Sequence, residues 1–103
     1  MAALLRRVAV EGGFATVMKK GDEQSGSLLI FVSSRGAHVA CLERVLGTDG
    51  GYRWERAGPA ESASSIEIAD FLARRARFDG DLWAIELDIA EAERFVAETM
   101  LTG

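Results

Sequence analysis

The chain begins with a stretch in which apolar residues recur at helical spacing and then changes to strand-like alternation. Leu4, Leu5 and Val8 fall on one face of a helix predicted over residues 2–11, and the glycine pair that follows ends it. Strands are predicted over residues 14–20, 27–34, 37–46, 52–56 and 82–88. The pattern therefore predicts a mixed α and β protein.

The second predicted strand is the most apolar part of the chain. Every residue from Leu28 to Val32 is apolar, so both faces of this strand are apolar. Such a strand is typical of the centre of a sheet that is covered on both sides. The polar, glycine-bounded loop over residues 21–26 predicts that this strand forms a hairpin with the strand before it.

The fourth predicted strand alternates strictly. Tyr52, Trp54 and Arg56 lie on one face, and Arg53 and Glu55 lie on the other. An aromatic stripe of this kind is more often sheet packing than a binding platform. At a sheet edge, however, such a strand can pair with another chain, so we identify Tyr52 and Trp54 as candidate interface residues.

A capping box marks the start of the second predicted helix. Ser64 is placed to cap the helix, and Glu67 lies three residues later to reach back. Ile68, Phe71 and Leu72 form the predicted core stripe of this helix. The arginines of its last turn suit the negative end of the helix dipole.

A last helix is predicted after Asp88, where Ala92, Phe95 and Val96 recur at helical spacing. The predicted order is α-β-β-β-β-α-β-α. Consecutive hairpins predict an α+β fold, a mainly antiparallel sheet of about five strands with helices packed on it. At 103 residues, the chain is expected to form a single domain over residues 1–103.

Composition narrows the classes of partner. The formal net charge of −4 repels polyanions, so we expect no nucleic-acid partner. The longest aliphatic-aromatic run is far too short to span a bilayer, and we expect no membrane association. The lone Cys41 excludes an internal disulfide and indicates a reducing compartment, the cytoplasm. No cofactor or metal is expected.

His38 and Cys41 are the one possible cysteine–histidine dyad. Both lie in the third predicted strand, three positions apart, where side chains alternate between faces. We therefore predict that they point to opposite sides of the sheet, out of each other's reach. The expectation is a buried thiol and a surface or edge imidazole.

Two groups of charged residues are candidates for binding a small anionic ligand. They are Arg7, Arg53, Arg56 and Arg75, together with Asp79, Asp81 and Glu86. Clustered arginines bind phosphates and carboxylates through two hydrogen bonds at once. The competing interpretation is that the arginines pair with surface acids, and that the acids serve as caps and turns rather than as metal ligands.

Several segments together resemble a known family. They are Ala3 to Arg7, Gly12 to Phe14, Lys20 to Asp22 with Gly26, Tyr52 to Trp54 with Arg56, Phe78 to Glu86, and Ala92 to Phe95. In these motifs the chain resembles the bacterial DUF1491 family, whose members have no assigned function. The resemblance covers nearly the whole chain, and the run from Phe78 to Glu86 is its most specific piece. It implies a bacterial, cytosolic protein, and it implies no activity and no catalytic residue.

Two functions remain open from the sequence. The first is a non-catalytic interaction module, as a homodimer or with another protein, which the small size and the alternating fourth strand favour. The alternative is a binder of, or an enzyme acting on, a small anionic ligand through the arginine clusters. The spatial arrangement distinguishes them, because a ligand site needs these residues in one concave pocket.

Overall fold

A computed structural model describes residues 2–10, 12–22, 27–46 and 48–89 of the chain, without the side chains of residues 2–5, 46 and 52. The elements are α1 (Ala2–Val10), β1 (Phe14–Lys19), β2 (Leu28–Ser34), β3 (Ala37–Leu46), β4 (Tyr52–Ala57), α2 (Ser65–Phe78) and β5 (Trp83–Asp88). Their order and bounds agree closely with the prediction. The helix predicted after Asp88 lies outside the described residues.

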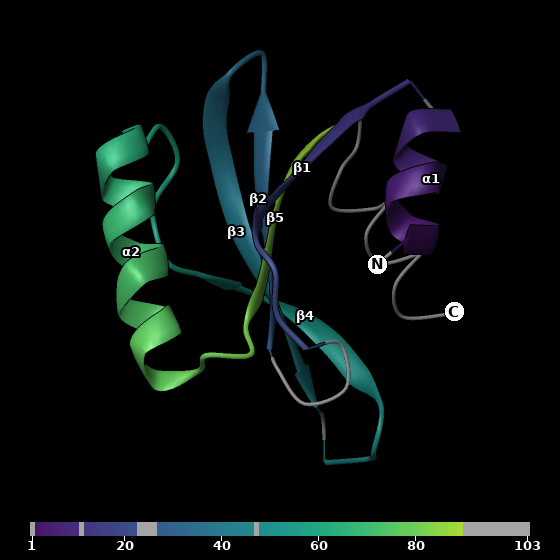
Figure 1. Cartoon of the computed structure of the whole chain (residues 1–103), viewed down its shortest axis with the longest axis vertical. Coiled ribbons are helices and arrows are strands. Elements are labelled where there is room, and N and C mark those ends of the chain that lie inside the picture. The colour runs from purple at the N-terminus through teal and green to yellow at the C-terminus, as the bar shows by residue number, and fades with distance from the viewer. Residues whose placement is uncertain (1, 11, 23–26, 47, 90–103) are drawn as a thin grey trace.

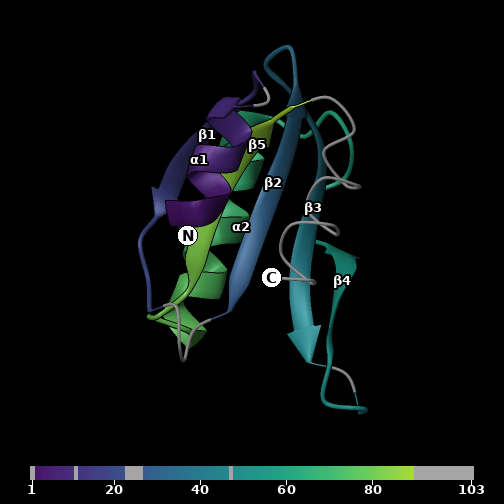
Figure 2. The same cartoon turned by 90° about the vertical axis from the view of Figure 1, so that its right-hand side faces the viewer.

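The five strands form one sheet, seen nearly edge-on in Figure 1, in the order β1-β5-β2-β3-β4 (Figure 2). Three pairings are antiparallel, and β2 pairs with β5 in parallel, so the sheet is mixed but mainly antiparallel, and the predicted α+β class is confirmed. The predicted hairpin between β1 and β2 is wrong, because β5 lies between them. Leu82 to Ile85 are all buried, so β5 needs cover on both faces and takes a central position that the half-exposed β1 does not need.

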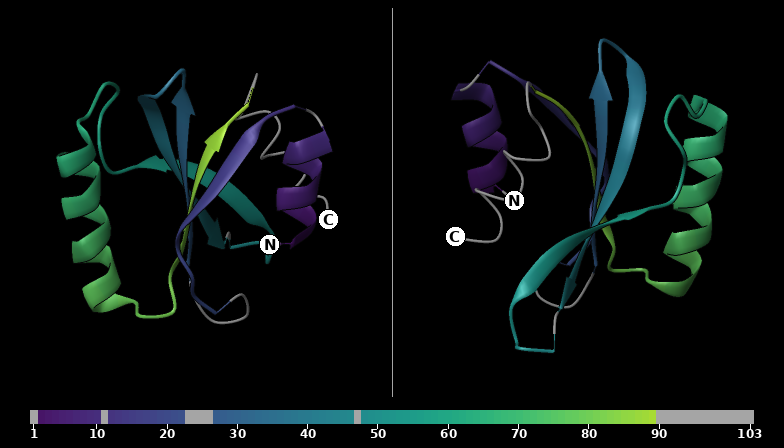
Figure 3. Two further views of the ribbon diagram at one scale, coloured as in Figure 1. Left: turned by 45° about the horizontal axis from the view of Figure 1, so that its top comes forward. Right: turned by 180° about the vertical axis from the view of Figure 1, so that it is seen from behind.

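The two helices cover opposite faces of the sheet (Figure 3). On the α1 side, Val8 packs with alternate residues of the central strands, which are Leu28, Ile30, Val32, Leu42, Trp83, Ile85 and Leu87. On the α2 side, the predicted helix stripe packs over Leu29, Phe31, Cys41, Leu82 and Ala84. The two-sided burial of β2 is therefore confirmed, and the sheet separates two small cores.

Local signals explain how α2 is placed. The Ser64 hydroxyl accepts a hydrogen bond from the backbone N–H of Glu67, and the Glu67 carboxylate accepts one from the N–H of Ser64, which confirms the capping box. At the other end, the Asp79 N–H donates to the carbonyl of Arg75. The helix therefore starts where the sequence predicts, and it ends at Phe78.

Candidate functional site

The structure corrects the prediction for His38 and Cys41. The register between β2 and β3 shifts between Val32 and Ser33, which inserts a β-bulge next to His38. The bulge reverses the alternation, so the His38 ring packs against Phe31, in the same core layer as Cys41, with ring centroids 6.2 Å apart. His38 is buried rather than exposed, and its Nε2 lies 3.2 Å from the carbonyl oxygen of Pro59.

Sharing a face does not make these two residues a catalytic pair. Burial raises the pKa of the Cys41 thiol to about 12, although the Arg75 guanidinium opposes part of this shift. A thiol with so high a pKa is protonated near neutral pH and is a poor nucleophile. The hydrogen-bond partner that the structure gives His38 is a backbone carbonyl, which suits a structural role.

The candidate arginines do not gather at one place. Arg7 lies exposed on α1, whereas Arg75 lies on α2, across the sheet (Figure 1). Arg53 and Arg56 lie exposed on β4, three positions apart in a strand and therefore on opposite faces. The four arginines therefore share no pocket.

Two of these arginines are held by carboxylates. Arg75 makes two hydrogen bonds to the Glu43 carboxylate of β3, with both side chains partly buried. These bonds raise the pKa of Arg75. The Arg75 guanidinium carbon also lies 5.9 Å from the ring centroid of Phe71. Arg53 is paired along its own strand with Glu55, with 2.8 Å between Nη2 and Oε1.

The candidate acids have structural roles that the sequence alone did not reveal in full. Asp79 Oδ2 accepts a hydrogen bond from the backbone N–H of Ser27 at 3.0 Å, and Oδ1 accepts one from Asp81 N–H at 3.1 Å. The Ser27 hydrogen bond is the main reason that the pKa of Asp79 is lowered. The backbone N–H of Trp83 in turn donates to the carbonyl of Ser27. Together these hydrogen bonds connect the end of α2 to the starts of β2 and β5, and we call this set of contacts the Asp79 joint.

Of the other two candidate acids, Asp81 contacts Asp79 through its backbone N–H, and Glu86 lies apart from these contacts. Asp81 is exposed in the turn before β5, and its carbonyl accepts from the N–H of Asp22. Glu86 is exposed within β5, at register positions beside Thr16 and Phe31. Among the described residues, no group of three metal-ligating side chains comes together.

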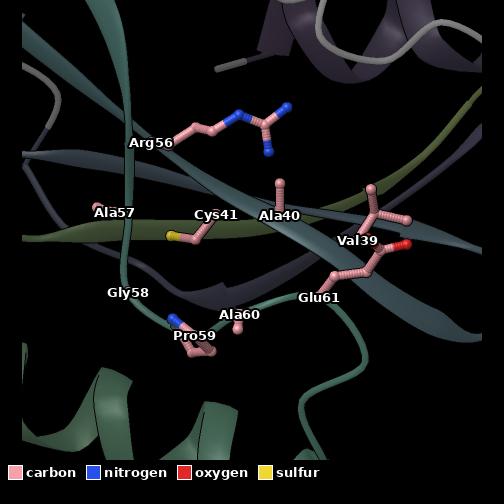
Figure 4. Close-up of a pocket in the computed structure, with 9 residues that line it drawn as sticks. All are labelled: Val39, Ala40, Cys41, Arg56, Ala57, Gly58, Pro59, Ala60 and Glu61. Carbon is pink, nitrogen blue, oxygen red and sulfur yellow. The ribbon is translucent and has the colours of Figure 1, made fainter.

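One concave site contains a candidate arginine. A cavity of about 440 Å³ lies where β4 ends and the chain turns away from β3 (Figure 4). Its walls include Arg56, Glu61 and the segment from Ala57 to Ala60, with Cys41 at the level of the sheet. Arg56 is the one candidate ligand residue in this lining. Glu61, which also lines the cavity, carries a negative charge that offsets the positive charge of Arg56. The cavity is therefore a poor match for a strongly anionic ligand.

The strand β4 lies at an edge of the sheet, the position at which its candidate interface residues could pair with another chain. In the described part of the chain, β4 pairs with β3 alone and lies at the end of the sheet (Figure 2). Its register with β3 runs without a shift from Cys41 opposite Ala57 to Leu46 opposite Tyr52. The N–H and C=O groups on the other side of such a strand are free to pair with an additional strand.

The side chains of β4 divide by face. Trp54 packs against the core on the α1 side, so the aromatic position contributes mainly to sheet packing, as predicted. The indole N–H groups of Trp54 and Trp83 are buried without a hydrogen-bond partner among the described residues. Arg53 and Glu55 lie on the opposite face, with 59% and 50% of their side-chain surface exposed. The Tyr52 side chain lies outside the described ones.

The family model described as "Protein of unknown function (DUF1491)" matches residues 1–97. The chain belongs to the DUF1491 family. The resemblance noted in the motifs is confirmed over almost the whole chain, including the run from Phe78 to Glu86. In this structure the run includes the hydrogen bonds of Asp79 and the buried start of β5, so these parts of it serve the fold.

Solved structures agree with this assignment. The crystal structure of a DUF1491 family protein from Caulobacter crescentus CB15 has 31% sequence identity and a TM-score of 0.71, covering 91% of this chain and 87% of that one. A solution structure from A. tumefaciens has 32% identity and a TM-score of 0.70, covering 87% of this chain and 81% of that one. No curated protein matches the chain. Among the described residues, no helix is long and apolar enough to cross a membrane.

Proposed function

We propose that this DUF1491 domain is a non-catalytic interaction module of the bacterial cytoplasm, and that the open edge of β4 binds an extended strand of a protein partner. The observation that supports this is the uninterrupted register of β4, which among the described residues is paired with β3 alone. Strand addition to such an edge uses main-chain hydrogen bonds for affinity and alternate side chains for specificity. The bacterial relatives and the buried, unpaired Cys41 support the location.

The test is to select extended peptides from a displayed library on the folded domain and to map their footprint by hydrogen exchange. We expect slower exchange of the β4 amides in the presence of a selected peptide, and no change along β1. Selected peptides that protect β1 or the cavity beside Arg56, and leave β4 unchanged, would contradict the proposal.

The alternative function, a binder of or an enzyme acting on a small anionic ligand, has one supporting observation: Arg56 lines the 440 Å³ cavity. A thermal-shift screen with nucleotides, phosphorylated metabolites and carboxylates tests it. A ligand present at a hundred times its Kd should raise the Tm by about 10 °C or more in a domain of this size. A shift of that size that Arg56→Ala abolishes would favour this alternative over the interaction module.

A further inference from the structure

We propose that the strand that pairs with β4 is β4 of a second copy of this chain, in an antiparallel register that places Trp54 opposite the partner's Trp54. This inference rests on the proposed function, because it needs the β4 edge to accept a strand. It goes further by naming the partner and the residues that select it.

Symmetry limits the possible registers. In a two-fold dimer that extends the sheet across two β4 strands, the axis is perpendicular to the sheet, so the α1 sides of both copies face the same way. Residues directly opposite each other must then share a face, because side chains alternate along each strand. The axis must therefore pass midway between one residue and its own copy, and near the middle of β4 this residue is Arg53, Trp54 or Glu55.

The charges on β4 select one of these registers. An axis at Arg53 places this guanidinium opposite its own copy, and an axis at Glu55 places two carboxylates opposite each other. Like charges directly opposite in a sheet are destabilising. An axis at Trp54 instead places Arg53 opposite the partner's Glu55, and symmetry forms this pair twice.

The structure shows that both groups are available for this contact. The side chains of Arg53 and Glu55 are 59% and 50% exposed on the face away from the α1-side core, and they already form an ion pair with each other within the strand. Charged residues on an edge strand normally discourage pairing. Here their opposite signs on either side of Trp54 make the strand complementary to itself, which is the feature that favours a second copy over an unrelated strand.

The size of the contact predicts weak association. Stable dimers bury about 1,200–2,000 Å² in total, whereas β4 offers six residues. We therefore expect a dimer with a Kd above about 10 μM. The measurement has to extend to millimolar protein.

Sedimentation of charge variants tests the pairing. We expect wild-type protein to dimerise, and Arg53→Glu and Glu55→Arg each to weaken dimerisation by about tenfold, since each places two like-charged pairs across the strands. The double variant R53E/E55R should dimerise like the wild type. Arg74→Glu makes the same change in net charge as Arg53→Glu, at an exposed position of α2, and should have no effect, which controls for net charge in that variant.

Cysteine variants read the register directly. Directly opposite residues in an antiparallel pair lie close enough for a disulfide. Trp54→Cys should therefore oxidise to a covalent dimer by itself. Arg53→Cys and Glu55→Cys, both at exposed positions, should form little dimer alone but should cross-link when mixed. The buried Cys41 is not expected to compete.

The outcomes separate the two proposals. A wild-type protein that is monomeric at millimolar concentration overturns the inference, while the peptide footprint still decides whether β4 accepts a strand. A dimer that the charge variants do not weaken, or a Glu55→Cys variant that cross-links efficiently alone, overturns the register. A dimer in which β4 amides exchange as in the monomer overturns this inference, and the peptide footprint then decides the proposed function.

Discussion

The two outer strands of the sheet, β1 and β4, are both six residues long and both pair with one neighbour, yet they differ in how they end the sheet. The β1 register with β5 shifts between Val17 and Lys19, and the Lys19 ammonium is tied to carbonyl oxygens of the neighbouring turn. A bulge and a lysine are standard means of protecting an edge from additional strands.

By contrast, β4 has neither a bulge nor a lysine, and its ladder with β3 is regular throughout. Arg53 and Glu55 are of opposite sign on either side of Trp54, so they do not repel a copy of the same strand in a register centred on Trp54. The comparison shows that the two edges of this sheet differ, because β1 carries both protective features and β4 carries neither. The predictions below test whether β1 is fixed by the fold while β4 is free of such constraints.

The largest expected effect on the free energy of unfolding is at Gly21, one of the two glycines near the ends of these strands. A Cβ added at Gly21, which follows β1, would lie 2.0 Å from the Asp81 carbonyl oxygen, so the backbone would have to move. We expect Gly21→Ala to lower the free energy of unfolding by about 3 kcal/mol. At Gly51, before β4, the nearest atom to an added Cβ is an Asp49 carboxylate oxygen at 3.5 Å, an ordinary contact.

Urea denaturation of both variants provides the measurement, with Gly51→Ala as the matched control. We expect the control to change the free energy of unfolding by less than about 0.5 kcal/mol. Similar losses at the two positions would show that the end of β1 is no more constrained than the start of β4.

The next effect concerns the Asp79 joint beside β5. Asp79→Ala removes acceptors for two backbone N–H groups, at Ser27 and Asp81, and should lower the free energy of unfolding by about 1–2 kcal/mol. Asp49→Ala is the control near β4, since Asp49 accepts one bond from the exposed N–H of Gly51. Urea titrations should show a clearly smaller loss for the control.

The same joint predicts a pH dependence. Because folding lowers the pKa of Asp79, its ionised form contributes stability above the unfolded value of about 3.9. That contribution should be lost as the pH falls through the lowered pKa of the folded state. The gap in unfolding free energy between wild type and Asp79→Asn should therefore narrow below about pH 4. A gap that stays constant down to pH 2 contradicts this assignment.

A smaller effect on the free energy of unfolding is expected when the Lys19 ammonium is removed. Lys19→Met keeps the aliphatic stem but removes donors to the carbonyl oxygens of Gly80, at 2.7 Å, and Leu82, at 3.2 Å. We expect a loss of about 1 kcal/mol in unfolding free energy and faster hydrogen exchange at the end of β1. Lys20→Met, at the next and exposed position, controls for the loss of charge. Equal losses in the two variants would indicate a general charge effect.

The sequence predicted local features better than the arrangement of strands. Ser64 and Glu67 capped α2 as expected, and the apolar run in β2 correctly indicated a central strand. The position of β5 was missed because the polar loop after β1 indicates a local hairpin, and sequence neighbours carry no information about a strand that joins from far along the chain. The parallel pairing of β2 and β5 is such a long-range contact.

The errors at the candidate site have similar causes. The β-bulge that buries His38 has no sequence signal of its own, so strict alternation gave the wrong face. Glu43, the partner of Arg75, was not identified because the two residues meet only when α2 packs across β3. The alternation in β4 was correct because a regular strand follows the period of two on which the prediction depends.

The smallest expected effect is that of salt on dimerisation, which separates the contribution of the charged side chains of β4 from that of its backbone hydrogen bonds. If Arg53 and the partner's Glu55 select the register, raising the ionic strength should screen both pairs and weaken dimerisation by about threefold between 0.05 and 0.5 M salt. The backbone hydrogen bonds are insensitive to salt, so dimerisation should be reduced and not abolished. Sedimentation at the two salt concentrations measures the change, and R53E/E55R should show the same dependence. A Kd that is unchanged by salt would mean that the ladder alone holds the dimer, and that the charges of β4 do not choose its partner.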